Sequence, residues 1–153
     1  MTIDELLQGS GLAEKAVRLD EHLVRMQWGS AFVIAGISGS AVVAVAPLFK
    51  QLPAGREAEF FKRLLEHNAH MGGIASFAIQ PDGWVVLHAG RALKGLDGHE
   101  LATLIAGVGK FADQYDDQLL AEFFAGKREA RGDDAAPEAV SPDTSGAELP
   151  QTD

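Results

Sequence analysis

The sequence predicts an α+β fold in which a mostly antiparallel sheet of five strands packs with helices. Short segments with apolar residues at alternate positions are joined by tight-turn sequences, a pattern typical of hairpins. Segments with apolar residues three and four apart lie before, between and after them, a pattern typical of amphipathic helices. The predicted order is α-β-β-β-α-β-β-α over residues 1–126, followed by an acidic tail over residues 127–153.

The N-terminal region, residues 3–19, has a helical pattern with an interruption. Thr2 and Glu5 have the spacing of a capping box, in which the two side chains satisfy backbone donors at the start of a helix. Residues 9–11, with the sequence Gly-Ser-Gly, interrupt the pattern. We therefore expect a broken helical region here.

Three strands are predicted next, over residues 23–28, 31–37 and 41–49. In the first, Val24, Met26 and Trp28 alternate with polar residues, which indicates a strand with one buried face. Gly29-Ser30 fits a two-residue hairpin turn of type II′. Pro47 cannot donate to a strand ladder, so we expect it at an edge or a bulge.

A helix is predicted from Glu57 to Asn68, because four apolar residues lie on one side of it: Phe60, Phe61, Leu64 and Leu65. Asn68 suits its end, since Asn tolerates the left-handed conformation. A hairpin should follow, with strands over residues 74–80 and 84–89. Its turn, Pro81-Asp82-Gly83, combines a fixed φ with a residue that allows positive φ.

The last helix is predicted to begin at Asp97, with Glu100 completing a capping box. Gly126 suits the position just after its end. One apolar stripe runs along it: Leu101, Leu104, Ile105, Val108, Phe111, Ala112, Tyr115, Leu119 and Phe123. Gly107 and Gly109 each weaken a helix by up to about 1 kcal/mol relative to Ala. They predict either a bend or a close approach of another backbone.

The composition restricts the class of protein. The chain has 153 residues, is 46% hydrophobic and has no Cys, which excludes disulfides and thiolate metal sites. Its net charge of −9 disfavours a nucleic-acid surface. We see no signal peptide, and the longest apolar run, residues 41–49, is too short to span a bilayer. We therefore expect a cytoplasmic protein without membrane or direct nucleic-acid partners.

The last part of the chain differs from the rest. Residues 127–153 contain three basic and seven acidic residues, three prolines and no aromatic residue. A segment of this composition cannot bury enough apolar surface to offset its ordering entropy. We predict a folded domain over residues 1–126 and a disordered acidic tail beyond it.

Part of the chain, about residues 57–124, resembles the YbjN family of bacterial sensory transduction regulators. The resemblance is in core and turn residues: Leu64-Leu65 with Asn68, Phe77-Ala78-Ile79, Pro81-Asp82-Gly83, Leu87, Leu96-Asp97, and Ala112-Asp113 before Leu119. That family is similar in fold to the type III secretion chaperones. The resemblance implies the same order of elements, a homodimer, and a regulatory or chaperone-like protein that binds a partner protein without catalysis or a cofactor.

Two alternative functions can be formulated from the residues. His67 and His70 lie three apart at a helix end and could ligate a metal with Glu66 or His88, as in a metal-dependent enzyme. The spacing is not that of the H-E-x-x-H motif, so ordinary surface or interface histidines are the favoured interpretation. Direct nucleic-acid binding is the other alternative, which the charge disfavours.

Two further sets of side chains have competing interpretations. Asp113, Asp116 and Asp117 are interpreted as a solvated helix face rather than as paired catalytic carboxylates. Val24, Met26 and Trp28 are the candidate partner-binding residues, since Met adapts to varied partners and an exposed sheet edge invites pairing. The alternative is that these three side chains face the core.

Overall fold

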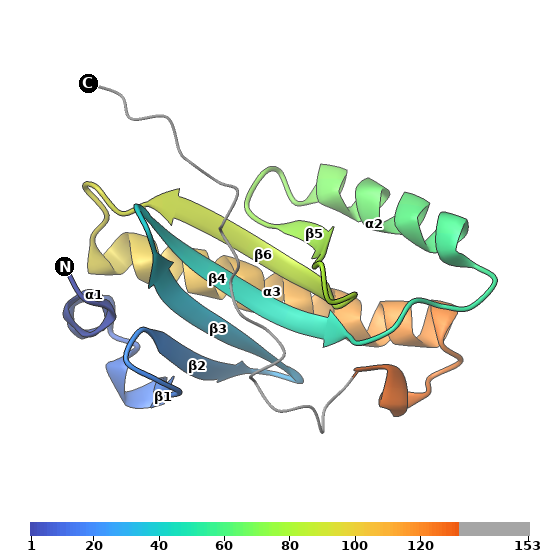
Figure 1. The fold of residues 1–153 in the computed structure, drawn as a ribbon, viewed down its shortest axis with the longest axis horizontal. Helices are drawn as coiled ribbons and strands as arrows, with labels where there is room; N and C mark the ends of the chain where they lie inside the picture. The colour runs from blue at the N-terminus through green and yellow to red at the C-terminus, as the bar shows by residue number, and fades with distance from the viewer. Residues whose placement is uncertain (132–153) are drawn as a thin grey trace.

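A six-stranded antiparallel sheet forms the centre of the molecule, in the order β1-β2-β3-β4-β6-β5 (Figure 1). The computed structural model describes residues 1–131. Its strands are β1 (Val17–Arg18), β2 (Leu23–Trp28), β3 (Ala31–Ser38), β4 (Ala41–Phe49), β5 (Ser76–Ile79) and β6 (Val85–Ala92). Its helices are α1 (Ile3–Ser10), α2 (Glu57–His70) and α3 (Gly98–Phe123), with the 3₁₀ turns η1 (Ala13–Lys15) and η2 (Arg128–Arg131).

The predicted fold class and order of elements are confirmed, with one strand more than predicted. The extra strand, β1, lies inside the region predicted to be helical and pairs Val17 with Arg25. The chain can reverse between β1 and β2 because the Asp20 carboxylate accepts hydrogen bonds from the backbone N–H groups of His22 and Leu23. A short side-chain-stabilised turn of this kind competes with helix formation.

Local signals place most boundaries. The capping boxes at Thr2 and Asp97 are both formed. The hairpin turns lie where predicted, with Gly29 and Gly39 at positive φ. Pro47 lies at a β-bulge in the central strand β4, where the register with β6 shifts. Beyond Pro47 the consecutive side chains of Leu48 and Phe49 are both buried in the main core.

Helix α2 runs past Asn68 to His70, in contrast to the predicted end. Its cap is Met71, whose backbone N–H bonds to the carbonyls of His67 and Asn68. The Asn68 side chain has a different role, because its Oδ1 accepts the backbone N–H of Phe77 at 2.7 Å. Asn68 thus ties α2 to the edge strand β5.

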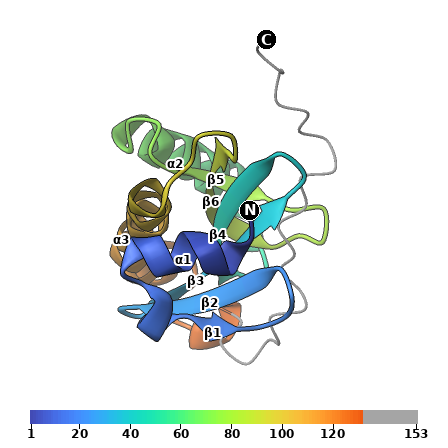
Figure 2. The ribbon, with the colours of Figure 1, turned by 90° about the vertical axis from the view of Figure 1, so that its left-hand side faces the viewer.

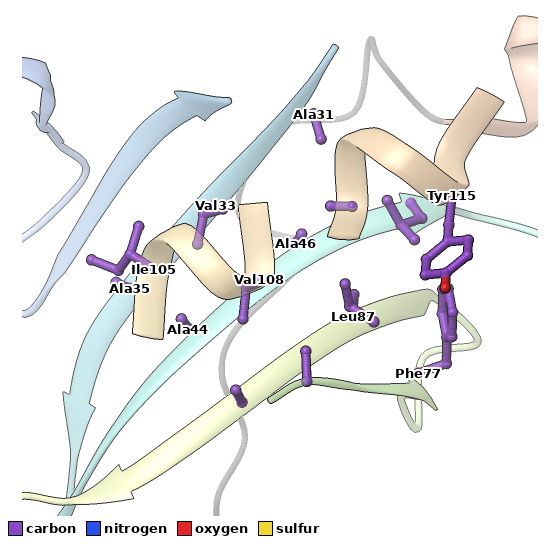
Figure 3. Packing of buried hydrophobic residues seen from close by; sticks show 14 of the residues in the cluster. Ala31, Val33, Ala35, Ala44, Ala46, Phe77, Leu87, Ile105, Val108 and Tyr115 are labelled. Carbon is purple, nitrogen blue, oxygen red and sulfur yellow. The ribbon is translucent and has the colours of Figure 1, made fainter. Parts of the chain in front are cut away.

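The main core lies between α3 and one face of the sheet (Figure 3). The strands contribute small side chains here, Ala35, Ala44 and Ala46, and α3 contributes larger ones such as Ile105 and Val108. Small residues on the sheet let the helix lie close to it, so the larger helix side chains fill the space. Helices α1 and α2 add to this same core, and Figure 2 shows α2 and α3 on the same side of the sheet.

Helix α3 runs without interruption from Gly98 to Phe123, and its two glycines both lie at close approaches. A Cβ on Gly109 would lie 2.5 Å from Cγ of Trp28, and one on Gly107 would lie 2.7 Å from Cγ2 of Ile74. The close neighbours are side chains, whereas a second backbone was one of the two alternatives predicted from the sequence.

The chain remains packed beyond Gly126, where the sequence analysis placed the end of the domain. Ala130 in η2 is fully buried, and its carbonyl accepts the backbone N–H of Lys50 at 3.0 Å. The structure therefore describes a folded chain as far as Arg131. Most of the predicted acidic tail, residues 132–153, lies outside the described residues.

Candidate protein-binding surfaces

The predicted partner-binding residues of β2 lie mainly in the interior. Val24 is 2% exposed and Met26 is 1% exposed, both in the main core, and Trp28 packs against that core over Gly109. Their strand pairs with β3 so that Met26 lies opposite Val33, another core residue. The alternative interpretation, that these side chains face the core, is the arrangement observed, and they form no open surface in the single chain.

An apolar surface is present elsewhere, on α2 and around β5. Its members are exposed large side chains, which we call the α2–β5 patch: Phe61 (37% exposed), Leu65 (68%), Ile74 (47%) and Ile79 (43%). Six large apolar residues are exposed in residues 1–131, and these four all come from the segment 57–79. Exposed large apolar side chains that come from one segment of the chain are candidates for an interaction site.

The four apolar residues of α2, predicted to lie on one side of the helix, are on two sides in the structure. Phe60 and Leu64 are buried, whereas Phe61 and Leu65 are exposed. Adjacent residues on a helix are about 100° apart around its axis. In each pair of adjacent apolar residues, one side chain therefore faces the core and the other faces outward. The doubled pairs Phe60-Phe61 and Leu64-Leu65 were the signal that could have revealed this surface.

The two edges of the sheet differ in how many backbone groups are available to pair with another strand. On β5, the Asn68 side chain occupies the Phe77 N–H, which protects that edge from pairing. On the opposite side, β1 pairs only with Val24 and Arg25. No described strand covers the same side of residues 26–28, so this part of the β2 edge is not paired with another strand.

The second face of the sheet carries a separate apolar cluster, which we call the outer sheet face. Its buried members are Ile34, Val43, Val45, Trp84 and Val86. Partly buried apolar residues of β3 and of the β1–β2 hairpin flank it, and the guanidinium of Arg25 lies 4.0 Å from the ring centre of Phe32. No helix in residues 1–131 contributes to this cluster.

The two candidate metal ligands are in different environments. His67 lies with its ring centre 4.2 Å from that of Tyr115, and its buried Nε2 has no hydrogen-bond partner. Burial, helped by the nearby Arg63, lowers the pKa of His67 below its usual value. His70 is exposed. No three His, Cys, Asp or Glu side chains lie close enough to hold a metal within the described part of the chain.

The predicted solvated face of α3 is correct for Asp113 and Asp117, which are exposed, and wrong for Asp116, which is buried in a structural network. Asp116 is 1% exposed, and its Oδ2 accepts the Ser30 hydroxyl at 2.8 Å and pairs with the Arg131 guanidinium. Asp113 accepts the Ser30 backbone N–H at 2.8 Å. Burial raises the pKa of Asp116, whereas the backbone hydrogen bond from Ser30 lowers the pKa of Asp113.

The position of Asp116 could have been read from the sequence, because it lies four residues after Ala112 on the apolar stripe. The ion pair with Arg131 could not be predicted from the sequence, because Arg131 lies beyond the end of the helix and has no fixed spacing to the stripe. Asp117 projects outward and pairs with Arg131 at 3.0 Å. The arrangement fastens η2 to α3 and to the β2–β3 turn, and it brings no pair of carboxylates together in an open cleft.

No helix of the described residues is both long enough and apolar enough to cross a bilayer. This observation concerns residues 1–131 only.

Comparison with known proteins matches most of this fold to one family. The family model described as "Tir chaperone protein (CesT) family" matches residues 2–110. No curated protein matches the chain in sequence. The sequence resemblance pointed to the YbjN family and, through it, to the secretion chaperones; the matching family is that of the chaperones.

Two solved structures share the fold. One is the crystal structure of the ExsC–ExsE complex, at 17% identity over 76% of this chain and 95% of that chain, with a TM-score of 0.55. The other is the heterodimeric ExoU–SpcU complex from the type III secretion system of Pseudomonas aeruginosa, at 19% identity over 74% and 93%, with a TM-score of 0.54. At these identities the similarity establishes a shared fold.

Proposed function

Because this chain belongs to the Tir chaperone protein (CesT) family, we propose that it is a non-catalytic, chaperone-like or regulatory protein that forms a homodimer and binds a partner protein. The observation that carries the proposal is the α2–β5 patch, which contains four of the six large apolar side chains that are exposed in residues 1–131. The two solved structures that share this fold are both complexes, ExsC–ExsE and ExoU–SpcU, which supports a binding role for this chain.

We propose the α2–β5 patch as the dimer surface. A twofold interface places the same patch on both subunits, so a self-complementary apolar surface suits it. Charged side chains border the patch and are already paired with each other, as in Lys62 with Glu66 at 2.5 Å and Arg63 with Glu122 at 2.9 Å. An apolar centre with a polar rim is the usual composition of a protein interface.

The partner segment has a different proposed site, the β2 edge at residues 26–28. Backbone N–H and C=O groups on an unpaired edge can hydrogen-bond to an extended segment of another protein. The opposite edge is less suitable because Asn68 occupies the Phe77 N–H. The dimer surface and the partner site would then lie at opposite edges of the sheet, so both could be occupied together.

The dimer proposal is tested with Leu65→Glu in the full chain. An unpaired charge buried in an interface costs about 3 kcal/mol, and a twofold dimer would bury two of them, so the dimer dissociation constant should rise at least about 100-fold. The matched control is Val17→Glu, because Val17 is 63% exposed on the opposite edge of the sheet. Light scattering across a dilution series measures both. A wild-type monomer, or equal effects of the two substitutions, would refute the assignment of the surface.

The partner proposal is tested by recovering tagged protein from nuclease-treated native lysate and identifying co-purifying proteins by mass spectrometry. We expect one stoichiometric protein. Its capture should be lost when Gln27→Pro interrupts the β2 edge, and it should persist with Leu65→Glu. Recovery of the bare protein alone would contradict the partner-binding role, whatever the oligomeric state proves to be.

A further inference from the structure

Strand β1 covers only part of the outer edge of β2, as Figure 2 shows. It consists of two residues, which pair with Arg25 and Val24 of the six-residue β2. Residues 26–28 of β2 have no described strand on that side. The edge proposed for the partner is therefore partly occupied by the chain itself.

Three residues of β2 direct their backbone groups to this edge. The carbonyl of Leu23 accepts the N–H of Leu19 at 3.0 Å, so Leu23 faces the β1 side. In an antiparallel ladder, alternate residues of a strand bond to the same neighbour, so the backbone groups of Arg25 and Gln27 face this side too. The turn before β2 occupies Leu23 and β1 occupies Arg25, which leaves Gln27 open.

The attachments of β1 to the rest of the molecule are weak. Both of its residues are exposed, Val17 at 63%. Arg18 forms an ion pair with Asp4 of α1, but both side chains are half-exposed, and ion pairs in such positions contribute little. The other hydrogen bonds of the Arg18 side chain go to the carbonyls of Asp20 and Glu21, at 3.1 and 3.2 Å. These bonds lie within the same segment and do not hold it to the sheet.

A hollow of about 340 Å³ lies between this segment and α1. Leu7, Ala16 and Val24 contribute to its apolar lining. Atoms that border a hollow lack contact partners on that side, so β1 is loosely packed. Helix α1 does not depend on β1 for its position, because Ile3 and Leu6 are buried in the main core. The β1 segment can therefore leave the sheet while α1 stays in place.

The strand at the opposite edge is held more firmly. Four residues of β5 pair with β6, and the Asn68 side chain fixes the Phe77 N–H at 2.7 Å. Of the two edge strands, β1 is therefore the one that can exchange with another segment.

We propose that β1 is a displaceable strand, which an extended segment of the partner protein replaces on the edge of β2. The partner segment then pairs with Leu23, Arg25 and Gln27 rather than with Gln27 alone. Its residue opposite Val24 lies on the face of the hollow, where an apolar side chain fits. This inference rests on the proposed function and adds an autoinhibitory contact to it, because β1 and the partner compete for the same backbone groups.

Hydrogen exchange measured by NMR in the full chain tests whether β1 opens by itself. Below the urea unfolding transition, the Arg25 amide should be protected about 100-fold less than the Met26 amide, which faces β3. The protection of Arg25 should also be independent of urea, because a local opening exposes little surface. Equal protection and equal urea dependence of the two amides would overturn the inference.

A disulfide then tests whether the partner replaces β1. The chain has no Cys, so Val17→Cys with Arg25→Cys, which we call the β1 lock, joins two directly opposite residues when oxidised and frees β1 when reduced. The matched control lock is Ala41→Cys with Ala92→Cys, which joins β4 to β6 away from this edge. The probe is the protein that the tagged wild-type chain recovers from native lysate without reductant.

The recovered amounts decide between the outcomes. The oxidised β1 lock should recover at least about 10-fold less of this protein than its reduced form, whereas the control lock should recover equal amounts in both forms. Equal recovery by the oxidised and reduced β1 lock would overturn the inference and leave the proposed function intact. Recovery of no partner by the wild-type chain would refute the proposed function, and this inference with it.

Discussion

Gly107 and Gly109 lie two residues apart on the same helix, and replacing each with Ala should have opposite effects on stability. Both substitutions gain about 1 kcal/mol of helix propensity. The new methyl group at position 107 meets only Cγ2 of Ile74, a branch methyl that a χ1 rotation can move away because the side chain is 47% exposed. We therefore expect Gly107→Ala to stabilise the protein by up to about 1 kcal/mol.

At position 109 the new methyl group meets the root of the Trp28 side chain. The distances are 2.5 Å to Cγ, 2.6 Å to Cδ2 and 3.0 Å to Cβ, so the indole cannot avoid it by rotating its far end. Overpacking of this kind costs about 1–3 kcal/mol. After the gain in helix propensity, Gly109→Ala should be neutral to about 2 kcal/mol less stable than wild type.

The measurement is urea unfolding monitored by circular dichroism for wild type and the two variants. All three proteins are compared at the same protein concentration, because the urea midpoint of a dimer depends on protein concentration. Tryptophan fluorescence should shift in Gly109→Ala and stay near wild type in Gly107→Ala. If Gly109→Ala were at least as stable as Gly107→Ala, the close packing of Trp28 on α3 would be refuted.

Three further substitutions test other contacts. Arg131→Gln leaves the buried Asp116 carboxylate without its cation and should cost about 3 kcal/mol of unfolding free energy, whereas adding Asp116→Asn should recover part of the loss; no loss in the single variant would contradict the network. Asn68→Ala removes the acceptor of the Phe77 N–H and should cost about 1–2 kcal/mol in urea unfolding, while exposed Ala69→Ser should have little effect. His67 has a lowered pKa in the fold, so its contribution to stability is complete above about pH 6.5 and is lost as pH falls through the folded value. His67→Gln should weaken the loss of stability between pH 7 and pH 5, and an unchanged pH profile would argue against its burial beside Tyr115.

The sequence predicted the elements whose signals are local. Capping at Thr2 and Asp97 depends on residues three apart, and the hairpin turns depend on two or three adjacent residues. Pro47 predicted an edge or a bulge, because proline has no N–H to donate to a strand ladder, and it lies at a bulge. Such features are determined by neighbours in the chain, so the chain alone reveals them.

The features that the sequence did not predict depend on distant partners. Strand β1 forms because β2 offers it an edge, and two residues carry too little periodicity to reveal it. Asp116 is buried because Arg131 and Ser30 lie beside it. Both sides of α2 carry apolar residues, so the sequence does not show which side is buried until α3 and the sheet cover one of them. The candidate surface was missed for this reason, since it consists of what the other elements leave uncovered.

The bulge in β4 limits how the length of this strand can vary. Because Leu48 and Phe49 both enter the core, the usual alternation of inward and outward side chains restarts at that point. Phe49 thereby reaches the aromatic rings of Phe60 and Phe124, at 6.2 and 4.9 Å between ring centres. Deleting one residue from the strand would present Lys50 to those rings in its place. Insertions and deletions should therefore be tolerated in the loop after Gln51 but not within β4 itself.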